Sequence, residues 1–243
     1  MNDILDAAGE ALRLIASLDP HLVEIVCLSL RVSLAAVVIS SLLGLPLGGI
    51  LAVARFPGRS VAAVVLNGLM GTPPVVVGLV VYLLVSRSGP LGVLGLLFSP
   101  AAMILAQSIL ALPIVASLSR QVVADLWEDY GEQLRSLGAR TDQSVRTLLW
   151  DARVSLATAG LAGFGRAIGE VGAVMIVGGN IDHATRVMTS AIALETSKGD
   201  FALALGLGII LLVLAIGVNA AAYGIAAAGR HAHLGPAAGR RTA

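Results

Sequence analysis

Residues 32–54, VSLAAVVISSLLGLPLGGILAVA, contain no Asp, Glu, Lys or Arg. Residues 60–86, 88–119 and 201–229 are equally free of these charges, and the four segments are 23, 27, 32 and 29 residues long. About 20 apolar residues suffice to cross a bilayer as a helix. Charged residues make up only 13% of the chain, against about a quarter in soluble domains. The sequence therefore predicts an all-α membrane protein.

The uncharged segments and their Gly and Pro positions divide the chain into about five expected spans. We expect an amphipathic helix within residues 1–20, a transmembrane domain over residues 21–229 and a short tail over residues 230–243. Residues 89–100, bounded by Gly-Pro and Ser-Pro pairs, are expected to form a short interfacial excursion. The expected spans are residues 28–54, 61–86, 101–119, 154–178 and 201–228.

The arginines predict how these spans are oriented. With five spans, residues 55–59, residues 120–153 and the tail share one side and carry 10 of the basic residues, against 4 on the other side. Cytoplasmic loops carry the excess of Lys and Arg. We therefore expect the N-terminus outside and the C-terminus in the cytoplasm.

The long polar stretch 120–153 is expected to form two helices at the cytoplasmic face. Apolar residues recur every three or four positions from Val123 to Leu137, which indicates an amphipathic helix that either packs within the loop or lies in a groove of a partner. Gly138 is expected to end this helix in a left-handed conformation. Thr141 or Asp142 is expected to cap a second helix.

Two charged residues interrupt the fourth expected span. Arg166 follows Arg153 after twelve uncharged residues, about 18 Å along a helix, and Glu170 follows at i+4, where the two side chains can pair. The pair is either a structural ion pair between helices or part of a translocation path or gate, with a proton relay as a further possibility. Gly44-x-x-x-Gly48 and Gly165-x-x-x-Gly169 are expected close-approach motifs.

Several segments resemble one family of transport proteins. Glu132-Gln133-Leu134, followed by Gly138, resembles the Glu-Ala-Ala-x-x-x-Gly loop of ABC-importer permeases, although Gln133 and Leu134 replace the two alanines. Residues 72–78, TPPVVVG, resemble the Pro-Pro-x-Val-x-Gly segment of molybdate-type permeases. Residues 165–173, GRAIGEVGA, resemble their Arg-x-x-Gly-Glu-x-Gly-Ala stretch, and residues 178–189 are most similar to the tungstate branch.

The resemblance implies a fold and a set of partners. The fold would be that of a type I ABC-importer permease, as in molybdate and methionine permeases. The chain would work as a homodimer in a bacterial or archaeal cytoplasmic membrane, with ABC ATPase subunits inside and an extracytoplasmic oxyanion-binding protein outside. The substrate would be tungstate, or alternatively molybdate or sulfate. The ATP and magnesium would be held by the ATPase, so no cofactor is expected on this chain.

The resemblance also selects candidate site residues. The loop that docks on the ATPase would use Tyr130, Glu132, Leu134, Leu137, Gly138 and Arg140. The translocation path or gate would include Thr72, Pro73, Pro74, Arg166 and Glu170. The outer loop offers donors for an oxyanion, which could instead cap helices or contact a partner: Asn180, Thr185, Arg186 and Thr189. His21 and His183 lack metal-ligand spacing and His231-x-His233 is expected to be solvated, so no metal site is expected.

Other functions are disfavoured by the same residues. A net charge of +1 gives no electrostatic case for nucleic acid. The only lysine, Lys198, follows Ser197, so the chain lacks a Gly-x-x-x-x-Gly-Lys phosphate loop and cannot itself hydrolyse ATP that way. A membrane enzyme would need convergent catalytic groups that the sequence does not suggest. A secondary transporter coupled through Glu170 stays open as an alternative, although no inverted repeat is evident.

Overall fold

The computed structural model describes residues 2–233, with the side chains of residues 7–225. Residues 234–243, most of the expected tail, and the side chains of His231 and His233 lie outside the described part. Within it the chain is helical and contains no strand. The elements are α1 (Asn2–Ala16), α2 (Pro20–Val53), α3 (Arg59–Met70), α4 (Pro74–Val85), the 3-10 helix η1 (Gly92–Leu94), α5 (Pro100–Ser136), α6 (Thr141–Asp151), α7 (Arg153–Ile168), α8 (Gly172–Gly178), α9 (Met188–Lys198) and α10 (Phe201–His233).

Three helices are long and apolar enough to cross a membrane alone: α2, α5 and α10. The second and fourth expected spans are not continuous helices, which corrects the sequence prediction. The pair α3 and α4 is bent by 100°, and the pair α7 and α8 by 62°, so the described residues offer three spans, or five if each bent pair counts as one. The physical cause is local: Pro73-Pro74 cannot continue α3, and Gly169 ends α7.

A second correction concerns the third span. The expected amphipathic helix at 122–137 is no separate element, because α5 runs without interruption from Pro100 to Ser136. The membrane span and the polar loop therefore share one helix of 37 residues. At 1.5 Å per residue this helix is about 55 Å long, which exceeds a bilayer core of about 30 Å.

The helices α2 and α5 pack closely along their length. Gly44 and Gly48 face α5, where a Cβ on Gly48 would overlap the Ala116 carbonyl and lie 2.7 Å from the Arg120 backbone nitrogen. Buried serines add hydrogen bonds: Ser40 Oγ donates to the Ser108 carbonyl at 3.0 Å, and Ser119 Oγ donates to the Leu45 carbonyl at 2.9 Å. The first expected glycine motif is thus a helix contact within the chain, as small residues permit.

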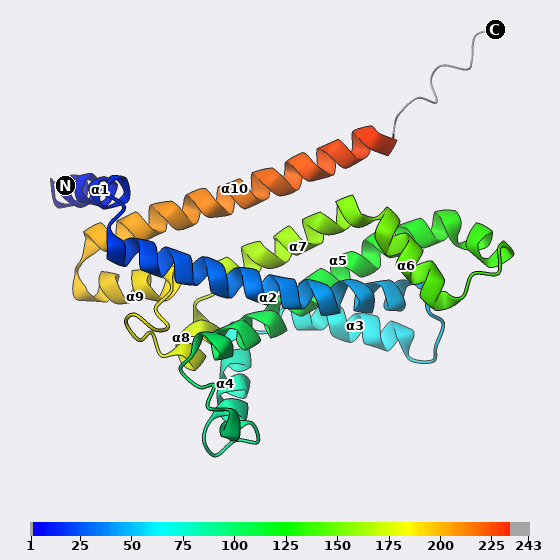
Figure 1. The fold of residues 1–243 in the computed structure, drawn as a ribbon, viewed down its shortest axis with the longest axis horizontal. Helices are drawn as coiled ribbons and strands as arrows, with labels where there is room; N and C mark the ends of the chain where they lie inside the picture. The colour runs from blue at the N-terminus through cyan, green and yellow to red at the C-terminus, as the bar shows by residue number, and fades with distance from the viewer. Residues whose placement is uncertain (1, 234–243) are drawn as a thin grey trace, which may run out of the picture.

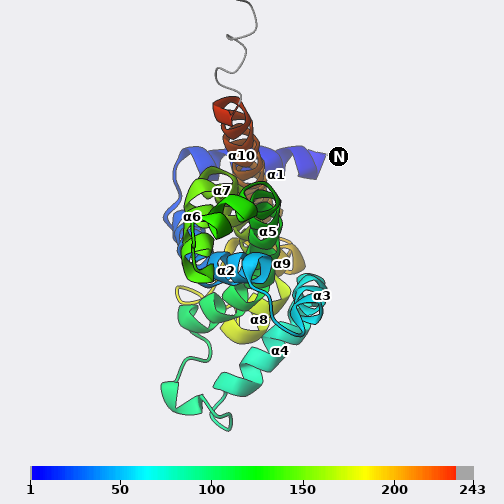
Figure 2. The ribbon, with the colours of Figure 1, turned by 90° about the vertical axis from the view of Figure 1, so that its right-hand side faces the viewer.

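The loops that the sequence assigns to the same side of the membrane lie at the same end of the bundle. One end holds the α2–α3 connection, the α5–α6 corner and the C-terminal end of α10, while α1, α9 and the start of α10 lie at the other end (Figure 1). Helix α4 and η1 project from the bundle on the side opposite α10 (Figures 1 and 2). The 89–100 segment therefore begins at the free end of a projecting helix and returns to the bundle, where the Phe98 amide donates to the Val177 carbonyl at 3.0 Å.

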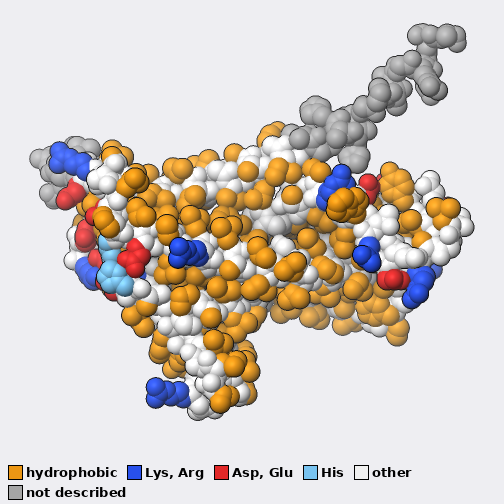
Figure 3. All heavy atoms as spheres, viewed as in Figure 1, with side chains coloured by type: hydrophobic (Ala, Val, Ile, Leu, Met, Phe, Trp, Pro, Cys, Tyr) orange, Lys and Arg blue, Asp and Glu red, His pale blue; other side chains and the backbone are white. Residues whose placement is uncertain are grey.

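Much of the molecular surface between the two ends is apolar. On the face shown in Figure 3, hydrophobic side chains cover the middle of the molecule and most visible charges lie toward its ends. Large apolar side chains are exposed on α2, α3, α4 and α10, including Leu42, Val64, Leu79 and Leu212. In water such a surface would aggregate, whereas lipid or another apolar protein face covers it without cost.

Candidate functional site

The two helix breaks meet in the middle of the molecule. A Cβ on Gly78 of α4 would lie 2.8 Å from the Ala173 Cα of α8, and one on Gly172 would lie 2.9 Å from a Val75 methyl group. The start of α4 and the start of α8 are therefore in contact, and we call the region of the two breaks, residues 71–73 and 169–171, the junction. Broken helices are tolerated at membrane depth only where the freed backbone is buried in protein or lines a cavity.

Glu170 lies at the junction and is 3% exposed. Its Oε2 accepts a hydrogen bond from Arg166 Nη1 at 2.7 Å, which is the predicted pair. The predicted helical geometry is wrong, however, because α7 ends at Ile168 and Glu170 lies beyond it. Its Oε1 accepts from the Ala173 backbone nitrogen at 3.1 Å. The carboxylate therefore joins the end of α7 to the start of α8, where a negative charge is favoured.

Two further polar residues complete the junction. The Nε2 of Gln107 on α5 donates to the Ala167 carbonyl at 3.0 Å, and its buried Oε1 has no partner. The Oγ1 of Thr189 on α9 donates to the Glu170 carbonyl at 2.8 Å. Gln107 was not among the predicted residues, although a glutamine inside an uncharged span is itself a signal. Helices α5, α7, α8 and α9 are thus held together by side-chain hydrogen bonds around Glu170.

Thr72, Pro73 and Pro74 form the other side of the junction. The Thr72 amide donates to the Leu69 carbonyl at 3.2 Å, which ends α3, and Pro74 is the first residue of α4. Proline is favoured at that position because its missing N–H would be unpaired in any case. The predicted path residues therefore lie beside the Glu170 segment, and the Val75 backbone nitrogen would be 3.6 Å from a Cβ on Gly172.

The α5–α6 corner comprises the end of α5, residues 137–140 and α6. Gly138 has a φ of 74°; its amide donates to the Arg135 carbonyl at 3.0 Å and the Ala139 amide donates to the Leu134 carbonyl at 2.9 Å. This is the helix end that a glycine permits. The predicted break at Gly138 is confirmed. Helix α6 begins one residue earlier than predicted, because Arg140 rather than Thr141 or Asp142 is its cap.

Most of the apolar stripe on α5 is used inside the chain. Val123 is buried and Leu126, Trp127 and Leu134 pack with it against Ala52, Val145 and Leu148. Three apolar side chains of the corner stay exposed: Tyr130 at 43%, Leu137 at 82% and Trp150 at 73%. Glu132 and Arg140 are also exposed, whereas Leu134 is partly buried. Trp150 was not among the predicted residues of this corner, although it is exposed.

A small polar hollow opens on the same corner. It has a volume of about 240 Å³ and is lined by residues that include Arg55, Arg135 and Thr141. The Arg135 guanidinium lies 5.1 Å from the centroid of the Trp127 ring, a cation–π distance that fixes its position. The corner thus offers exposed apolar side chains beside a cationic hollow.

The outer-loop donors make their hydrogen bonds within the chain. Buried Thr185 donates through Oγ1 to the Gly178 carbonyl at 2.5 Å and accepts from the Ile181 amide at 3.0 Å. Arg186 Nη1 lies 2.9 Å from Asp182 Oδ1, and Asn180 Nδ2 donates to the Ser190 carbonyl at 3.4 Å. Together with Thr189, these side chains stabilise the loop. The buried Nε of Arg186 and Oδ1 of Asn180 have no partner among the described residues.

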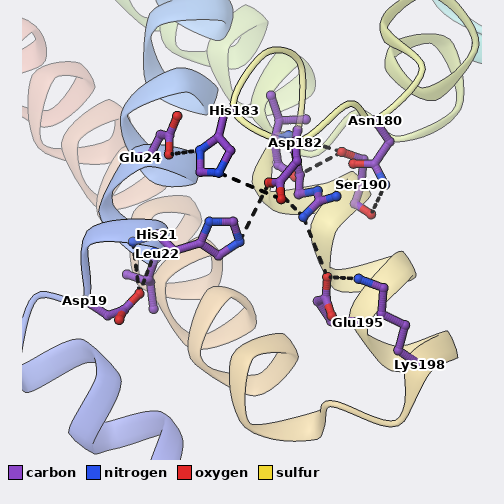
Figure 4. Close-up of polar contacts among 12 residues, drawn as sticks. Asp19, His21, Leu22, Glu24, Asn180, Asp182, His183, Ser190, Glu195 and Lys198 are labelled. Atoms are coloured by element: carbon purple, nitrogen blue, oxygen red, sulfur yellow. Dashed lines mark hydrogen bonds and ion pairs between the residues drawn. The ribbon is translucent and has the colours of Figure 1, made fainter.

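Two histidines come together at the same end of the molecule (Figure 4). The rings of His21 and His183 have centroids 5.8 Å apart, and His183 Nδ1 lies 2.7 Å from Glu24 Oε2. The hydrogen bond and the charge of Glu24, followed by the charge of Asp182, raise the pKa of His183 above its ordinary value, against the opposing effects of burial and Arg186. The two histidines are therefore not isolated, contrary to the sequence prediction.

Comparison with known proteins assigns the chain to a family. No protein-family model matches it. It is 46% identical over 205 residues to a probable anion ABC transporter permease of Haloferax volcanii, covering 82% of this chain and 88% of that protein. It is 37% identical over 225 residues to the tungstate uptake system permease TupB of Peptoclostridium acidaminophilum, covering 93% and 99%. A sulfate transport system permease, CysW of Synechococcus elongatus, is 32% identical over 180 residues, covering 70% and 62%. The chain, a multi-pass membrane protein, therefore belongs to the family of anion ABC transporter permeases.

Proposed function

We propose that this chain is the membrane-spanning subunit of an ATP-driven importer that carries an oxyanion, and that the oxyanion is tungstate. The observation that carries the substrate is the 37% identity to a tungstate permease, which extends over 99% of that protein's length. The resemblance of residues 178–189 to the tungstate branch supports the same choice. The chain is a transport subunit and not an enzyme, and it adopts the type I permease fold with its N-terminus outside.

The ATPase subunits bind the α5–α6 corner in this proposal. Tyr130, Leu137 and Trp150 are exposed side chains of the corner that also carries the cationic hollow, and aromatic side chains are common anchors of protein interfaces. Glu132, Gly138 and Arg140 lie on the same corner. Leu134 supports the corner from inside instead of contacting the partner, since it packs against the buried cluster. ATP and magnesium remain on the ATPase.

Movement of the corner reaches the junction through α5. From Tyr130 to Gln107 is about 35 Å along one helix, and Gln107 holds the end of α7. The junction, with Thr72, Pro73, Pro74, Arg166 and Glu170, is the gate of the path. Discontinuous helices mark such sites in other transporters. A second copy of the chain completes the path across an apolar face, and an extracytoplasmic binding protein delivers the anion at the outer end.

The test is the ATPase activity of the reconstituted permease–ATPase complex with its binding protein, in separate titrations of tungstate, molybdate and sulfate. We expect stimulation by tungstate at the lowest concentration. Stimulation by molybdate or sulfate first would keep the importer and change its substrate. A permease that assembles with no ATPase would overturn the proposal.

Sulfate is the second candidate, because the chain is also 32% identical to a sulfate permease. That match covers 62% of the sulfate permease, whereas the tungstate permease is matched over nearly its whole length. Tungstate and sulfate are both tetrahedral and doubly charged, so their shape and charge do not distinguish them. The same three titrations decide between the two substrates.

A further inference from the structure

Three ligand-type side chains meet at the outer end of the molecule and have no role in the proposed transport. His21 and Glu24 lie three residues apart at the start of α2, so they share one face of the helix. His183 comes from the loop between α8 and α9, 159 residues beyond Glu24. Figure 4 shows the His183 ring beside the Glu24 carboxylate, with the His21 ring near it and directed toward Asp182.

The geometry of the three groups is that of a small ligand set. One ligand atom from each of His21, Glu24 and His183 can be chosen so that all three lie within 4.8 Å of one another. In a tetrahedral zinc site the metal–ligand distances are about 2.0–2.2 Å, which places ligands about 3.3 Å apart. The His183–Glu24 contact of 2.7 Å would open slightly, and the His21 ring would move closer. All three side chains are solvent-accessible, so an ion can enter without unfolding the loop.

A second carboxylate, that of Asp182, lies next to both histidines. Asp182 lies 4.0 Å from the Nε2 atoms of both histidines, and Arg186 holds it at 2.9 Å. A carboxylate on the far side of a ligating imidazole fixes the ring and its tautomer. Arg186 Nη1 also lies 4.0 Å from Glu195 Oε1. Lys198 Nζ forms an ion pair with the same oxygen at 2.9 Å. The support is therefore a connected network, fixed to α9.

We propose that His21, Glu24 and His183 bind one divalent transition-metal ion, with zinc as the best-suited species. Two imidazoles and one carboxylate are ligands that zinc accepts, with water in the fourth position. The ion takes the place of the proton between His183 Nδ1 and Glu24, and that proton is released to solvent. Magnesium is excluded by the same ligands, because it prefers oxygen.

Metal binding would strengthen the link between two segments that already meet through the His183–Glu24 hydrogen bond, the contact between the two imidazole rings and the 4.0 Å approach of His21 to Asp182. The start of α2 and the loop of residues 179–187 would be joined by coordinate bonds. The same loop leads directly into Thr189, which is bonded to the Glu170 carbonyl. The site would thus stiffen the outer end of the molecule above the junction.

The test measures zinc binding to the full permease in detergent, purified without a histidine tag. The sequence has four histidines, so replacing His231 and His233 by alanine leaves only His21 and His183. In that background we expect one zinc per chain by titration calorimetry and a visible absorption band with Co²⁺. His21→Ala or His183→Ala should weaken binding by at least about 100-fold, and Asp182→Asn by about 10-fold.

Two controls separate the site from general surface binding. Glu10→Gln removes another exposed carboxylate at the same end of the molecule and should leave the affinity unchanged, and Mg²⁺ should not compete. Each variant must stay monodisperse in detergent. If an alanine variant aggregates, Glu24→Gln removes a ligand without changing the size of the side chain. Zinc affinity equal in the parent and in the His21→Ala/His183→Ala double variant, or no zinc binding by the parent, would overturn the site. Neither result bears on oxyanion transport.

Discussion

The α2–α5 pair and the junction are built on opposite principles. Helices α2 and α5 are continuous for 34 and 37 residues and touch through glycines and serines that leave little space between the backbones. The pairs α3–α4 and α7–α8 are bent by 100° and 62°, and the Glu170 side chain bridges the α7–α8 break through hydrogen bonds with Arg166 and the Ala173 amide. Tight apolar packing resists deformation, while a hydrogen-bonded break can rearrange between discrete states.

This difference suggests a division of labour within the bundle. The α2–α5 pair acts as a frame that carries movement, because α5 bears both the exposed Tyr130 and the junction residue Gln107. The junction is where that movement changes the packing of short helices. Four tests, taken in order of expected effect, examine whether the frame and the junction differ in this way.

The largest effect is expected from a methyl group inside the frame. In Gly48→Ala the new Cβ would overlap the Ala116 carbonyl and crowd Arg120 N at 2.7 Å, so we expect a loss of about 3 kcal/mol of stability. The control Gly165→Ala adds the same group where nothing lies within 4 Å and should stabilise by about 0.5–1 kcal/mol. Thermal unfolding in detergent compares them; equal midpoints would refute close packing as the basis of the frame. Gly165 also shows that the second expected glycine motif makes no such contact within the described chain.

A somewhat smaller effect is expected from breaking the Arg166–Glu170 pair. Arg166→Ala leaves a carboxylate that is 3% exposed without its cation, so we expect a loss of about 2 kcal/mol, discounted because the arginine is partly exposed. The double variant Arg166→Ala/Glu170→Ala removes that unpaired charge and should recover part of the loss. Unfolding midpoints of the single and double variants give the coupling between the two sites. No recovery in the double variant would argue against a pair.

A third substitution tests the α5–α6 corner, through which the ATPase is proposed to move the α2–α5 pair. Gly138→Val forces a branched residue to a φ of 74°, at a cost of about 1–2 kcal/mol. Gly199→Val imposes the same strain at a φ of 84° at the end of α9. We expect both to lose similar stability, but only Gly138→Val should raise the ATP hydrolysed per tungstate imported, by several-fold. Equal uncoupling by both variants would mean that the strain, and not the corner, is responsible.

The smallest effect on stability is expected at the exposed side chains of the corner. Leu137→Ala and Trp150→Ala remove groups that are 82% and 73% exposed, so unfolding should change by less than about 0.5 kcal/mol. ATPase binding should weaken about 10-fold, as for interface anchors. Leu134→Ala, which removes a packed side chain, should show the reverse: lower stability with little direct loss of binding. Pull-down of the ATPase and thermal unfolding separate the two classes.

The sequence predicted some elements well for a simple reason. Uncharged apolar runs predicted α2, the first half of α5 and α10, because apolar side chains favour lipid and a helix satisfies the backbone hydrogen bonds that lipid cannot. Gly138 predicted a helix end, because its left-handed conformation depends on that residue alone. Pro73-Pro74 predicts a kink in the second span, because proline lacks a backbone donor, although not a bend of 100°. The break at Glu170 was not predicted, although Gly169 beside a charge is a signal for it.

Composition and charge spacing by themselves determined that the chain crosses a membrane, where it turns at Gly138, and that Arg166 pairs with Glu170. These are local or short-range properties, fixed by hydropathy, glycine conformation and a spacing of four residues. Tertiary structure alone decided which parts of the α5 stripe are buried, that Gln107 and Thr189 join the junction, and that His183 meets Glu24 across 159 residues. Contacts between distant segments depend on how the helices pack, and a local sequence pattern does not specify this packing.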